Sequence, residues 1–259
     1  MSKSTTEAES ASAPVLAPEA LDRAANALRR SVEGSTSAFL YHAVCTLVFC
    51  RVWLWHLTPQ AAALPGAQGF GWFFRYLTFC SFTLQTILFF SSCLSELVKS
   101  QETRTRLRAA TNNLGCALFP IANTVTLMFY AVENATNGLV ERGGFNRPDW
   151  LDFSVHSGNS LAAWGDILLS PHRDFAPQAR SLAIALALAY SAWCLVVRAG
   201  YGKFPYPLLN KLPLAYGFFG FCVAGTSLVL FFFQVGAVAR WSLRRRRSPA
   251  RPVPTKKTD

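Results

Sequence analysis

The sequence predicts an all-α membrane protein, a bundle of six transmembrane helices in one domain. Of its 259 residues, 51% are hydrophobic and only 15% are charged, whereas about a quarter of the residues in a soluble domain are charged. The hydrophobic residues gather in runs near the ~20 residues that cross a bilayer. The net charge is +11, but the basic residues stand in short clusters between these runs, which argues against a nucleic-acid-binding protein.

Residues 1–36 precede the first hydrophobic run and are predicted to form a largely disordered cytosolic arm. Leu21, Ala25, Leu28 and Val32 fall at helical spacing, so a short surface helix is the alternative for part of the arm. Because the arm contains no apolar core, we expect no cleavable signal peptide before the first span.

Six candidate spans follow the arm. They are Ser37–Leu57, Arg75–Leu97, Asn112–Glu133, Trp150–Leu169, Arg180–Ala199 and Pro213–Val238. The fourth span is the least apolar, and a soluble amphipathic helix is the alternative for it. We expect it to cross the membrane because the clearly apolar spans before and after it must be connected on the correct sides of the membrane. Residues 37–239 are thus predicted to be the transmembrane domain and residues 240–259 a basic cytosolic tail.

The distribution of Lys and Arg predicts the orientation of the bundle. With six spans, the face that carries both termini has 18 Lys and Arg residues and the opposite face has 6. Cytosolic loops carry the excess of basic residues, so both termini are predicted to be cytosolic. Arg51 lies inside the first span, near enough to its end for the side chain to reach the interface.

Two short signals agree with this orientation. Asn134-Ala135-Thr136 is a glycosylation sequon that would face the lumen. Lys256-Lys257 resembles a dilysine retrieval signal, which predicts residence in the endoplasmic reticulum or another endomembrane. The run Arg244–Arg247 fits a stop-transfer cluster that touches anionic lipid, and a nucleic-acid patch is its alternative.

All seven cysteines lie within the candidate spans, and none has the pair spacing of metal ligands. Buried free thiols are the default for such residues. We therefore expect neither a metal site nor an organic cofactor.

Polar residues recur at helical spacing in three spans. These are Thr78, Ser81, Gln85, Ser92 and Glu96 in the second, Asn123, Thr126, Tyr130 and Glu133 in the third, and Asp152, His156, Asn159 and Asp166 in the fourth. Amide and ionisable groups in a membrane usually face the bundle interior, so the three rows are predicted to converge. Small hydroxyl residues also stabilise ordinary helix–helix contacts, which is the alternative for Ser81, Ser92 and Thr126.

Thr78 and His156 are the candidate catalytic pair. The second and fourth spans enter from the same face, and the two residues lie roughly 5 and 9 Å into their helices. A Thr hydroxyl becomes a nucleophile when a neighbouring base removes its proton, and a neutral His does so near pH 7. Asp152 precedes His156 by one helical turn, so its carboxylate is a candidate orienter of the imidazole.

Several motifs around these residues resemble those of one family. Arg75-Tyr76-Leu77-Thr78-Phe79 followed by Leu84-Gln85, Phe119-Pro120, and Trp150-Leu151 leading to His156-Ser157 are similar to motifs of the androgen-induced gene one and androgen-dependent TFPI-regulating proteins. A Gly202…Tyr206-Pro207 loop also matches. The similarity covers most of the bundle from Arg75 onward.

This resemblance implies a six-span membrane enzyme that hydrolyses fatty acid esters of hydroxy fatty acids with an intramembrane Thr and His. By motif, these two positions fall on Thr78 and His156. The sequence departs from the family pattern at Phe153, which replaces a first His, at Asp152, which replaces Asn, and at Ser157, which replaces Thr. Asp152 in place of Asn changes the electrostatics beside the proposed base, which puts the family's substrate range in question for this chain.

We therefore expect an intramembrane lipid ester hydrolase whose substrate enters sideways from the bilayer. Arg75, Gln85 and Asn159 are the candidate substrate-binding residues, and Arg75 would pair with the free carboxylate of the lipid. An ordinary interfacial anchor is the alternative for Arg75. A non-enzymatic transporter, with Asp166 and His156 as proton-coupled sites, and a lipid-binding or scaffold protein are the alternatives for the whole chain.

Overall fold

The computed structural model describes residues 18–135 and 148–247, and this part of the chain is helical with no strand. The long helices are α1 (Pro18–Trp55), α3 (Leu77–Leu97), α4 (Gln101–Ala135), α7 (Pro177–Tyr201) and α9 (Leu214–Arg247). Short elements join them: α2 (Pro59–Ala62), η1 (Pro65–Ala67), η2 (Trp72–Arg75), α5 (Asp149–Phe153), η3 (Ser154–Gly158), α6 (Asn159–Leu169) and α8 (Pro207–Lys211). The all-α prediction is confirmed.

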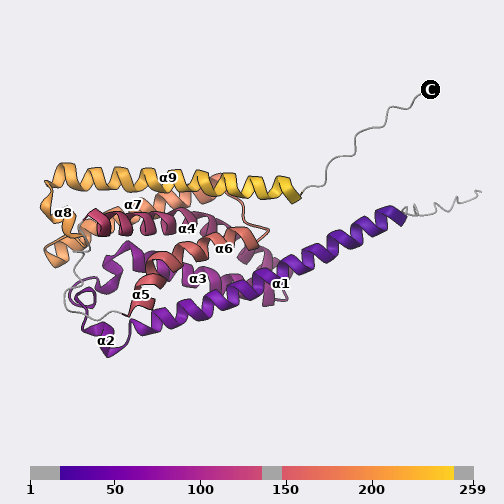
Figure 1. The fold of residues 1–259 in the computed structure, drawn as a ribbon, viewed down its shortest axis with the longest axis horizontal. Helices are drawn as coiled ribbons and strands as arrows, with labels where there is room; N and C mark the ends of the chain where they lie inside the picture. The colour runs from indigo at the N-terminus through magenta and orange to yellow at the C-terminus, as the bar shows by residue number, and fades with distance from the viewer. Residues whose placement is uncertain (1–17, 136–147, 248–259) are drawn as a thin grey trace, which may run out of the picture.

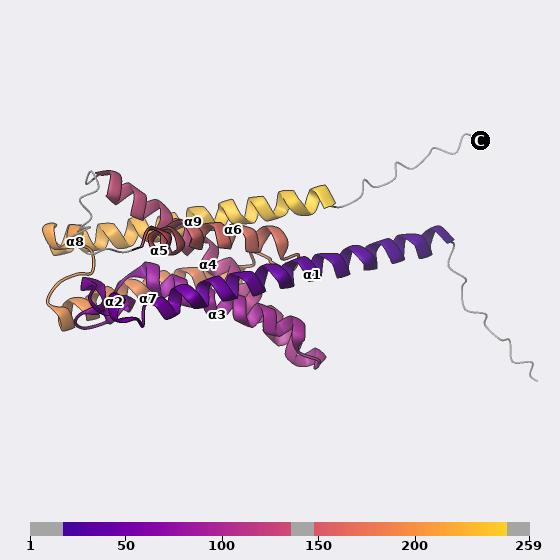
Figure 2. The same cartoon turned by 60° about the horizontal axis from the view of Figure 1, so that its bottom comes forward.

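Helix α4 occupies the centre of the bundle and packs against α3, α6, α7 and α9. Helices α1 and α9 lie on opposite sides, and the beginning of α1 and the end of α9 point toward the same end of the molecule (Figures 1 and 2). The middle of α4 is buried from Cys116 to Ile121, because neighbouring helices pack around it on several sides. Pro120 lies inside this helix and removes one backbone hydrogen bond.

Five described helices have the length and apolar composition of membrane spans. The stretches are Thr36–Trp55, Leu77–Leu97, Gln101–Val132, Pro177–Tyr201 and Leu214–Arg246. Only 17% of the most apolar stretch of α9 is buried, so this helix turns most of its hydrophobic surface outward, as lipid contact requires. These helices identify an integral membrane protein.

The predicted fourth span, Trp150–Leu169, is not among these five. Its residues form three consecutive pieces, α5, η3 and α6, because the helix changes its hydrogen-bond pattern in the middle. Asp152 and Asp166 also lower its apolar character. The sixth crossing therefore stays a prediction.

Several predicted boundaries differ from those of the helices. Residues 18–36, predicted as part of a largely disordered arm, are helical and continuous with the first span. After Pro18 this segment contains no proline, and it is rich in Ala, Leu and Arg, which favour a helix. Likewise α4 begins at Gln101 and α9 extends to Arg247, so part of the second connection and of the predicted tail is helical.

Candidate functional site

Polar side chains from α3, α4 and α6 meet in the interior, as the spacing of the three rows predicts. The Gln85 Nε2 atom lies 3.4 Å from the Asn159 Oδ1 atom, and both residues are buried. The Asn123 Oδ1 atom accepts hydrogen bonds from Ser160 at 2.7 Å and from Trp164 at 3.0 Å. These contacts connect α6, which belongs to the predicted fourth span, to both α3 and α4.

Contacts between the same helices fix their relative direction. Gln85 of α3 lies beside Asn159 of α6, and Ser92 lies beside the Arg173 guanidinium that holds Asp166. Residue numbers therefore increase in the same direction along both helices. Thr78 and His156 consequently lie on the same side of the Gln85–Asn159 pair.

His156 lies in a π turn, Ser154–Gly158, between α5 and α6. Such a turn inserts a residue into the helix and is frequent at functional sites. The π turn redirects the residues that follow it, because each hydrogen bond spans one more residue than in an α-helix. Sequence periodicity did not predict it, since the segment follows the ordinary helical spacing on both sides.

The His156 ring is held by a stacking contact on one face and by a hydrogen bond at Nδ1. Its plane stacks on Phe129 of α4, with ring centroids 3.5 Å apart and an interplanar angle of 7°. The Nδ1 atom lies 3.1 Å from the main-chain oxygen of Asp152, and 3.9 Å from a carboxylate oxygen of the same residue. A proton on Nδ1 donated to this carbonyl leaves Nε2 as the basic nitrogen. The closer orienting group is thus the Asp152 carbonyl, whereas the sequence pointed to its carboxylate.

Neighbouring hydrogen bonds hold the π turn against α4. The Thr126 hydroxyl donates to the main-chain oxygen of His156, and the Tyr130 hydroxyl lies 2.6 Å from the Ser157 hydroxyl. Thr126 and Tyr130 therefore position the backbone around His156. The sequence indicated this row of residues but not their partners.

Thr78 lies in the first turn of α3 and is half-buried. Helix α3 packs against the π turn. If Gln85 and Asn159 mark one level, Thr78 is seven residues before that level and His156 three residues before it. The difference of four residues corresponds to about 6 Å along the helix axis. Contact between the Thr78 hydroxyl and the imidazole stays a prediction.

Arg75 is a buried cation in the 3-10 turn that precedes α3, with 2% of its surface exposed. Its Nη2 atom donates to the main-chain oxygens of Pro65 and Gly66, and its guanidinium lies 4.3 Å from the centre of the Tyr201 ring. The Nε and Nη1 atoms have no hydrogen-bond partner. This burial differs from the exposed position of an ordinary interfacial anchor.

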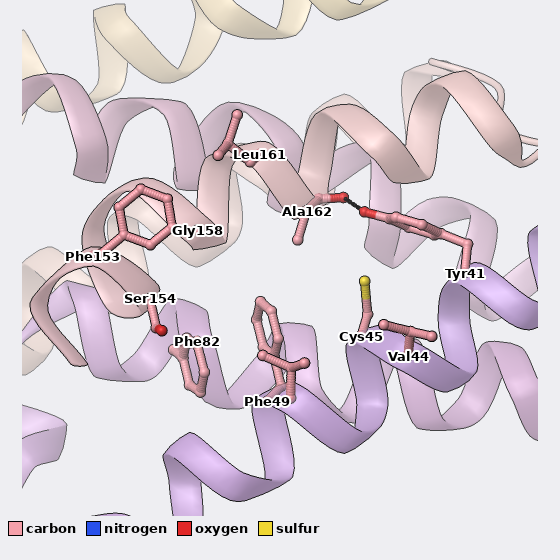
Figure 3. A pocket seen from close by; sticks show the side chains of 11 residues that line it. Tyr41, Val44, Cys45, Phe49, Phe82, Phe153, Ser154, Gly158, Leu161 and Ala162 are labelled. Atoms are coloured by element: carbon pink, nitrogen blue, oxygen red, sulfur yellow. Dashed lines mark hydrogen bonds between the residues drawn. The ribbon is translucent and has the colours of Figure 1, made fainter. Parts of the chain in front are cut away.

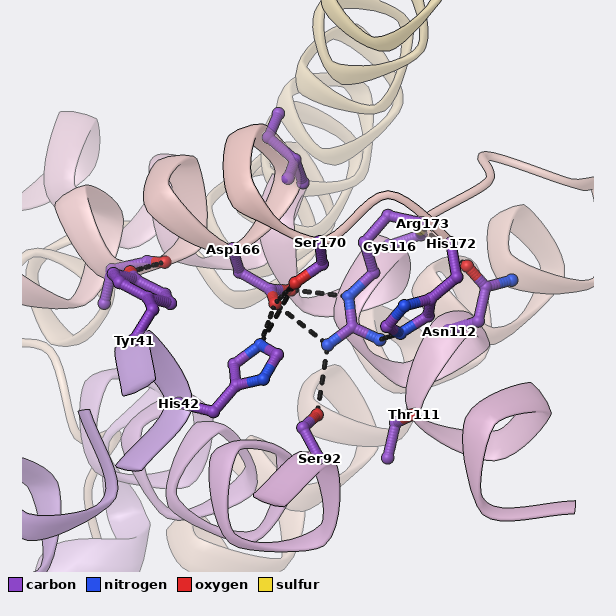
Figure 4. Close-up of polar contacts among 12 residues, drawn as sticks. Tyr41, His42, Ser92, Thr111, Asn112, Cys116, Asp166, Ser170, His172 and Arg173 are labelled. Carbon is purple, nitrogen blue, oxygen red and sulfur yellow. Dashed lines mark hydrogen bonds and ion pairs between the residues drawn. The ribbon is translucent and has the colours of Figure 1, made fainter. Parts of the chain in front are cut away.

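A second polar cluster lies near the other end of α6 (Figure 4). The sequence predicts Asp166 and Ser92 as interior polar residues, but it does not predict their partners His42 and Arg173. Asp166 receives two hydrogen bonds from Arg173, at 2.7 and 2.9 Å, and its Oδ1 atom lies 2.7 Å from His42 Nε2. Ser170 also donates to this carboxylate at 3.0 Å. Asp166, Arg173 and His42 are almost wholly buried.

The cluster joins elements that are far apart in the sequence. Arg173 donates to Ser92 of α3, and the Arg240 side chain donates to the main-chain oxygens of Arg173 and Ile167. An acidic residue inside a span usually pairs with another polar or charged group. Asp166 within the fourth span was therefore the signal in the sequence that a buried partner exists. Arg173 lies in a connecting loop, where a basic residue ordinarily faces the cytosol, so the sequence does not reveal the pair.

The chain matches the model of the family described as FAR-17a/AIG1-like protein over residues 37–238. It is also 26% identical over 146 residues to the androgen-dependent TFPI-regulating protein of Mesocricetus auratus. That alignment takes in 53% of this chain and 63% of the relative, so the chain spans less than two thirds of the relative's length. No solved structure matches the chain.

The family match includes Thr78 and His156 and, in the second cluster, His42, Asp166 and Arg173, whereas Arg240 lies just beyond its end. It confirms the resemblance seen in the Thr78 and His156 motifs, and it includes all six candidate spans. The chain belongs to the FAR-17a/AIG1-like protein family.

Proposed function

We propose that this protein is an intramembrane lipid ester hydrolase with Thr78 as nucleophile and His156 as general base. The observation that carries the proposal is the fixed position of the His156 imidazole. Its Nδ1 atom meets the Asp152 carbonyl and its ring stacks on Phe129, while α3, the helix of Thr78, packs against the same π turn. Acyl transfer requires a base with a defined tautomer together with a hydroxyl within its reach, and Thr78 is the proposed hydroxyl.

The proposed reaction begins when Thr78 attacks the ester carbonyl and His156 accepts the hydroxyl proton on Nε2. The tetrahedral intermediate then collapses to an acyl-threonine, and His156 returns the proton to the departing alkoxide. In the second half, His156 removes a proton from water, the resulting hydroxide attacks the acyl-threonine, and Thr78 is released with its proton restored. The products are a carboxylic acid and an alcohol.

The substrate class proposed is fatty acid esters of hydroxy fatty acids or related lipids, which enter from the bilayer. Such a lipid has a free carboxylate, and the Arg75 guanidinium has two donor atoms without partners. An anionic partner stabilises a buried cation, so Arg75 is the proposed binding site for the carboxylate of the lipid. Gln85 and Asn159 are proposed to support the polar interior beneath the ester.

The buried cluster around Asp166 weighs against a proton-coupled transporter. Two bonds from Arg173 and one from Ser170 stabilise the charged carboxylate. A coupling residue must exchange its proton during transport, and this carboxylate is compensated by a fixed cation. We assign Asp166 a structural role.

We also propose that both termini are cytosolic and that the protein resides in the endoplasmic reticulum or a related endomembrane. The beginning of α1 and the end of α9 lie at the same end of the molecule (Figure 1), which supports a common side. Near that end of α9, Arg245 stacks on the exposed Trp241 with its guanidinium 4.0 Å from the ring centre. This pairing suits an interface with anionic lipid. Asn134 lies near the end of α4. Thr136, Lys256 and Lys257 lie outside the described residues.

The proposal is tested by measuring hydrolysis of a fatty acid ester of a hydroxy fatty acid by the purified protein in phosphatidylcholine vesicles. Thr78→Ala and His156→Ala should each lower the rate at least 100-fold, since each removes one half of the reacting pair. Thr86→Ala is the matched control on α3, because the Thr86 hydroxyl bonds only its own helix at Phe82. Full activity of Thr78→Ala would exclude this mechanism.

A further inference from the structure

An apolar groove of about 300 Å³ opens between α1 and the segment formed by α5, η3 and α6 (Figure 3). Val44, Val48 and Phe49 of α1 form one wall, Leu161 of α6 the other, and Phe82 of α3 the back. Its volume is at the lower limit of small-molecule sites, which run from about 300 to 1,000 Å³.

The rim of the groove faces outward. Val44 is 60% exposed and Leu161 is 61% exposed. Helix α1 has the composition of a membrane span over Thr36–Trp55, so the mouth opens onto hydrocarbon rather than water. An apolar slot in this position can be filled by a hydrocarbon chain without loss of any hydrogen bond.

One end of the groove lies at the level of the π turn that carries His156. Ser154 and Gly158 line this end, and they are the first and last residues of the π turn that carries His156. On α3, Phe82 lines the groove one helical turn after Thr78, so both side chains lie on the same face. A chain that lies in the groove therefore extends from the level of Thr78 and His156.

Tyr41 closes the other end. Its hydroxyl donates to the main-chain oxygen of Ala162 at 2.6 Å, which bridges α1 and α6 across the groove. Gly165 lets the ring approach, because a Cβ atom there would lie 2.3 Å from the Tyr41 hydroxyl. From Tyr41 to Phe49 the groove follows about 12 Å of α1.

We propose that this groove holds one acyl chain of the lipid, with its carbonyl end at the π turn and its methyl end at Tyr41, which limits the chain length accepted. The position of the carbonyl end rests on the proposed hydrolase function. The occupancy of the groove by a hydrocarbon chain does not.

Photo-cross-linking tests occupancy without turnover. Thr78→Ala protein in phosphatidylcholine vesicles is irradiated with a fatty acid that has a diazirine near its methyl end, and the adducts are mapped by mass spectrometry. We expect adducts within residues 41–45 and 161–162, where the proposal places the methyl end, and a loss of at least five-fold when Leu161→Trp is added to fill the groove. Leu47→Trp is the matched control, because Leu47 is 73% exposed on α1 and does not line the groove. Equal labelling in both double variants would overturn the proposal.

Chain-length preference tests the role of Tyr41. Removing the ring in Tyr41→Ala should raise kcat/KM for esters that are two to four methylenes longer by at least about ten-fold relative to the shorter ones, since a single methylene in an apolar pocket already changes this ratio by about 10-fold or more. Tyr216→Ala, at a residue 84% exposed on α9, should leave the profile unchanged. An unchanged profile in Tyr41→Ala would remove Tyr41 from the proposal.

The two proposals fail separately. Lost hydrolysis in Thr78→Ala together with cross-linking that ignores Leu161→Trp would retain the hydrolase and reject the groove. Retained hydrolysis in Thr78→Ala together with cross-linking blocked by Leu161→Trp would do the reverse.

Discussion

The Gln85 side-chain amide lies 3.4 Å from the Asn159 side-chain oxygen in the buried centre of the bundle. This pair fixes α3 against α6 and thereby sets the relative height of Thr78 and His156. In a membrane interior, interhelical polar contacts of this kind are worth about 0.6–2 kcal/mol. The pair is therefore a register device for the proposed catalytic residues as well as a source of stability.

Gln85→Leu and Asn159→Leu should each destabilise the detergent-solubilised protein by about 1–3 kcal/mol, because each leaves a buried amide without its partner. The double variant should lose less than the sum of the two single losses. Thermal unfolding of all four proteins in one detergent measures the coupling. Additive losses would show that the two side chains do not interact.

Asp166→Asn should be among the most damaging single changes in the protein. It leaves the buried Arg173 guanidinium without a carboxylate, and breaking one partner of a buried ion pair costs about 3–5 kcal/mol. Asp166→Leu combined with Arg173→Met should recover part of the loss, since no unpaired charge remains. The yield of monodisperse protein and its unfolding temperature are the measurements. A wild-type unfolding temperature in Asp166→Asn would refute the structural role.

His172 lies in the loop between α6 and α7, and burial together with the Arg173 guanidinium lowers its pKa to about 4 from an ordinary 6.5. Between these values the unfolded chain binds a proton that the folded protein does not. The free energy of unfolding should therefore fall as the pH falls from about 6.5 to 4.

Comparison of the wild type with His172→Gln isolates this contribution from that of the carboxylates. The unfolding temperature of the variant should decline less steeply between pH 6.5 and 4, and the two proteins should show parallel curves above pH 7. Parallel curves over the whole range would show that His172 titrates normally in the folded protein.

Asp152→Asn distinguishes the two candidate orienters of His156. The main-chain oxygen, at 3.1 Å from Nδ1, stays in place in this variant, whereas the carboxylate, at 3.9 Å, is lost. We expect the hydrolysis rate to stay within about ten-fold of wild type. A loss near the 10⁴-fold seen when a triad aspartate becomes asparagine would assign the orienting role to the carboxylate.

Much of the fold follows from the sequence because long apolar runs leave few alternatives in a membrane. The helical spacing of Gln85, Asn123 and Asn159 also predicted their convergence, since amides are costly against lipid. The π turn at His156 could not be predicted, because its neighbours keep the ordinary apolar periodicity and the change lies in the backbone hydrogen bonds.

The buried cluster was missed for a different reason. Arg173 follows the helix of Asp166 in a short loop, where a basic residue ordinarily faces the cytosol. Only the return of the loop over the bundle, held by Arg240 on α9, makes Arg173 a partner of Asp166. Pairing that depends on tertiary structure leaves no periodic pattern in the sequence.

The most direct test of the central claim is the site of covalent labelling by a fluorophosphonate probe in the membrane-embedded protein. The account predicts one phosphonylated residue, Thr78, with labelling lost in Thr78→Ala and His156→Ala and retained in Thr86→Ala. A probe adduct on another residue, or labelling that persists at wild-type level in Thr78→Ala, would contradict it.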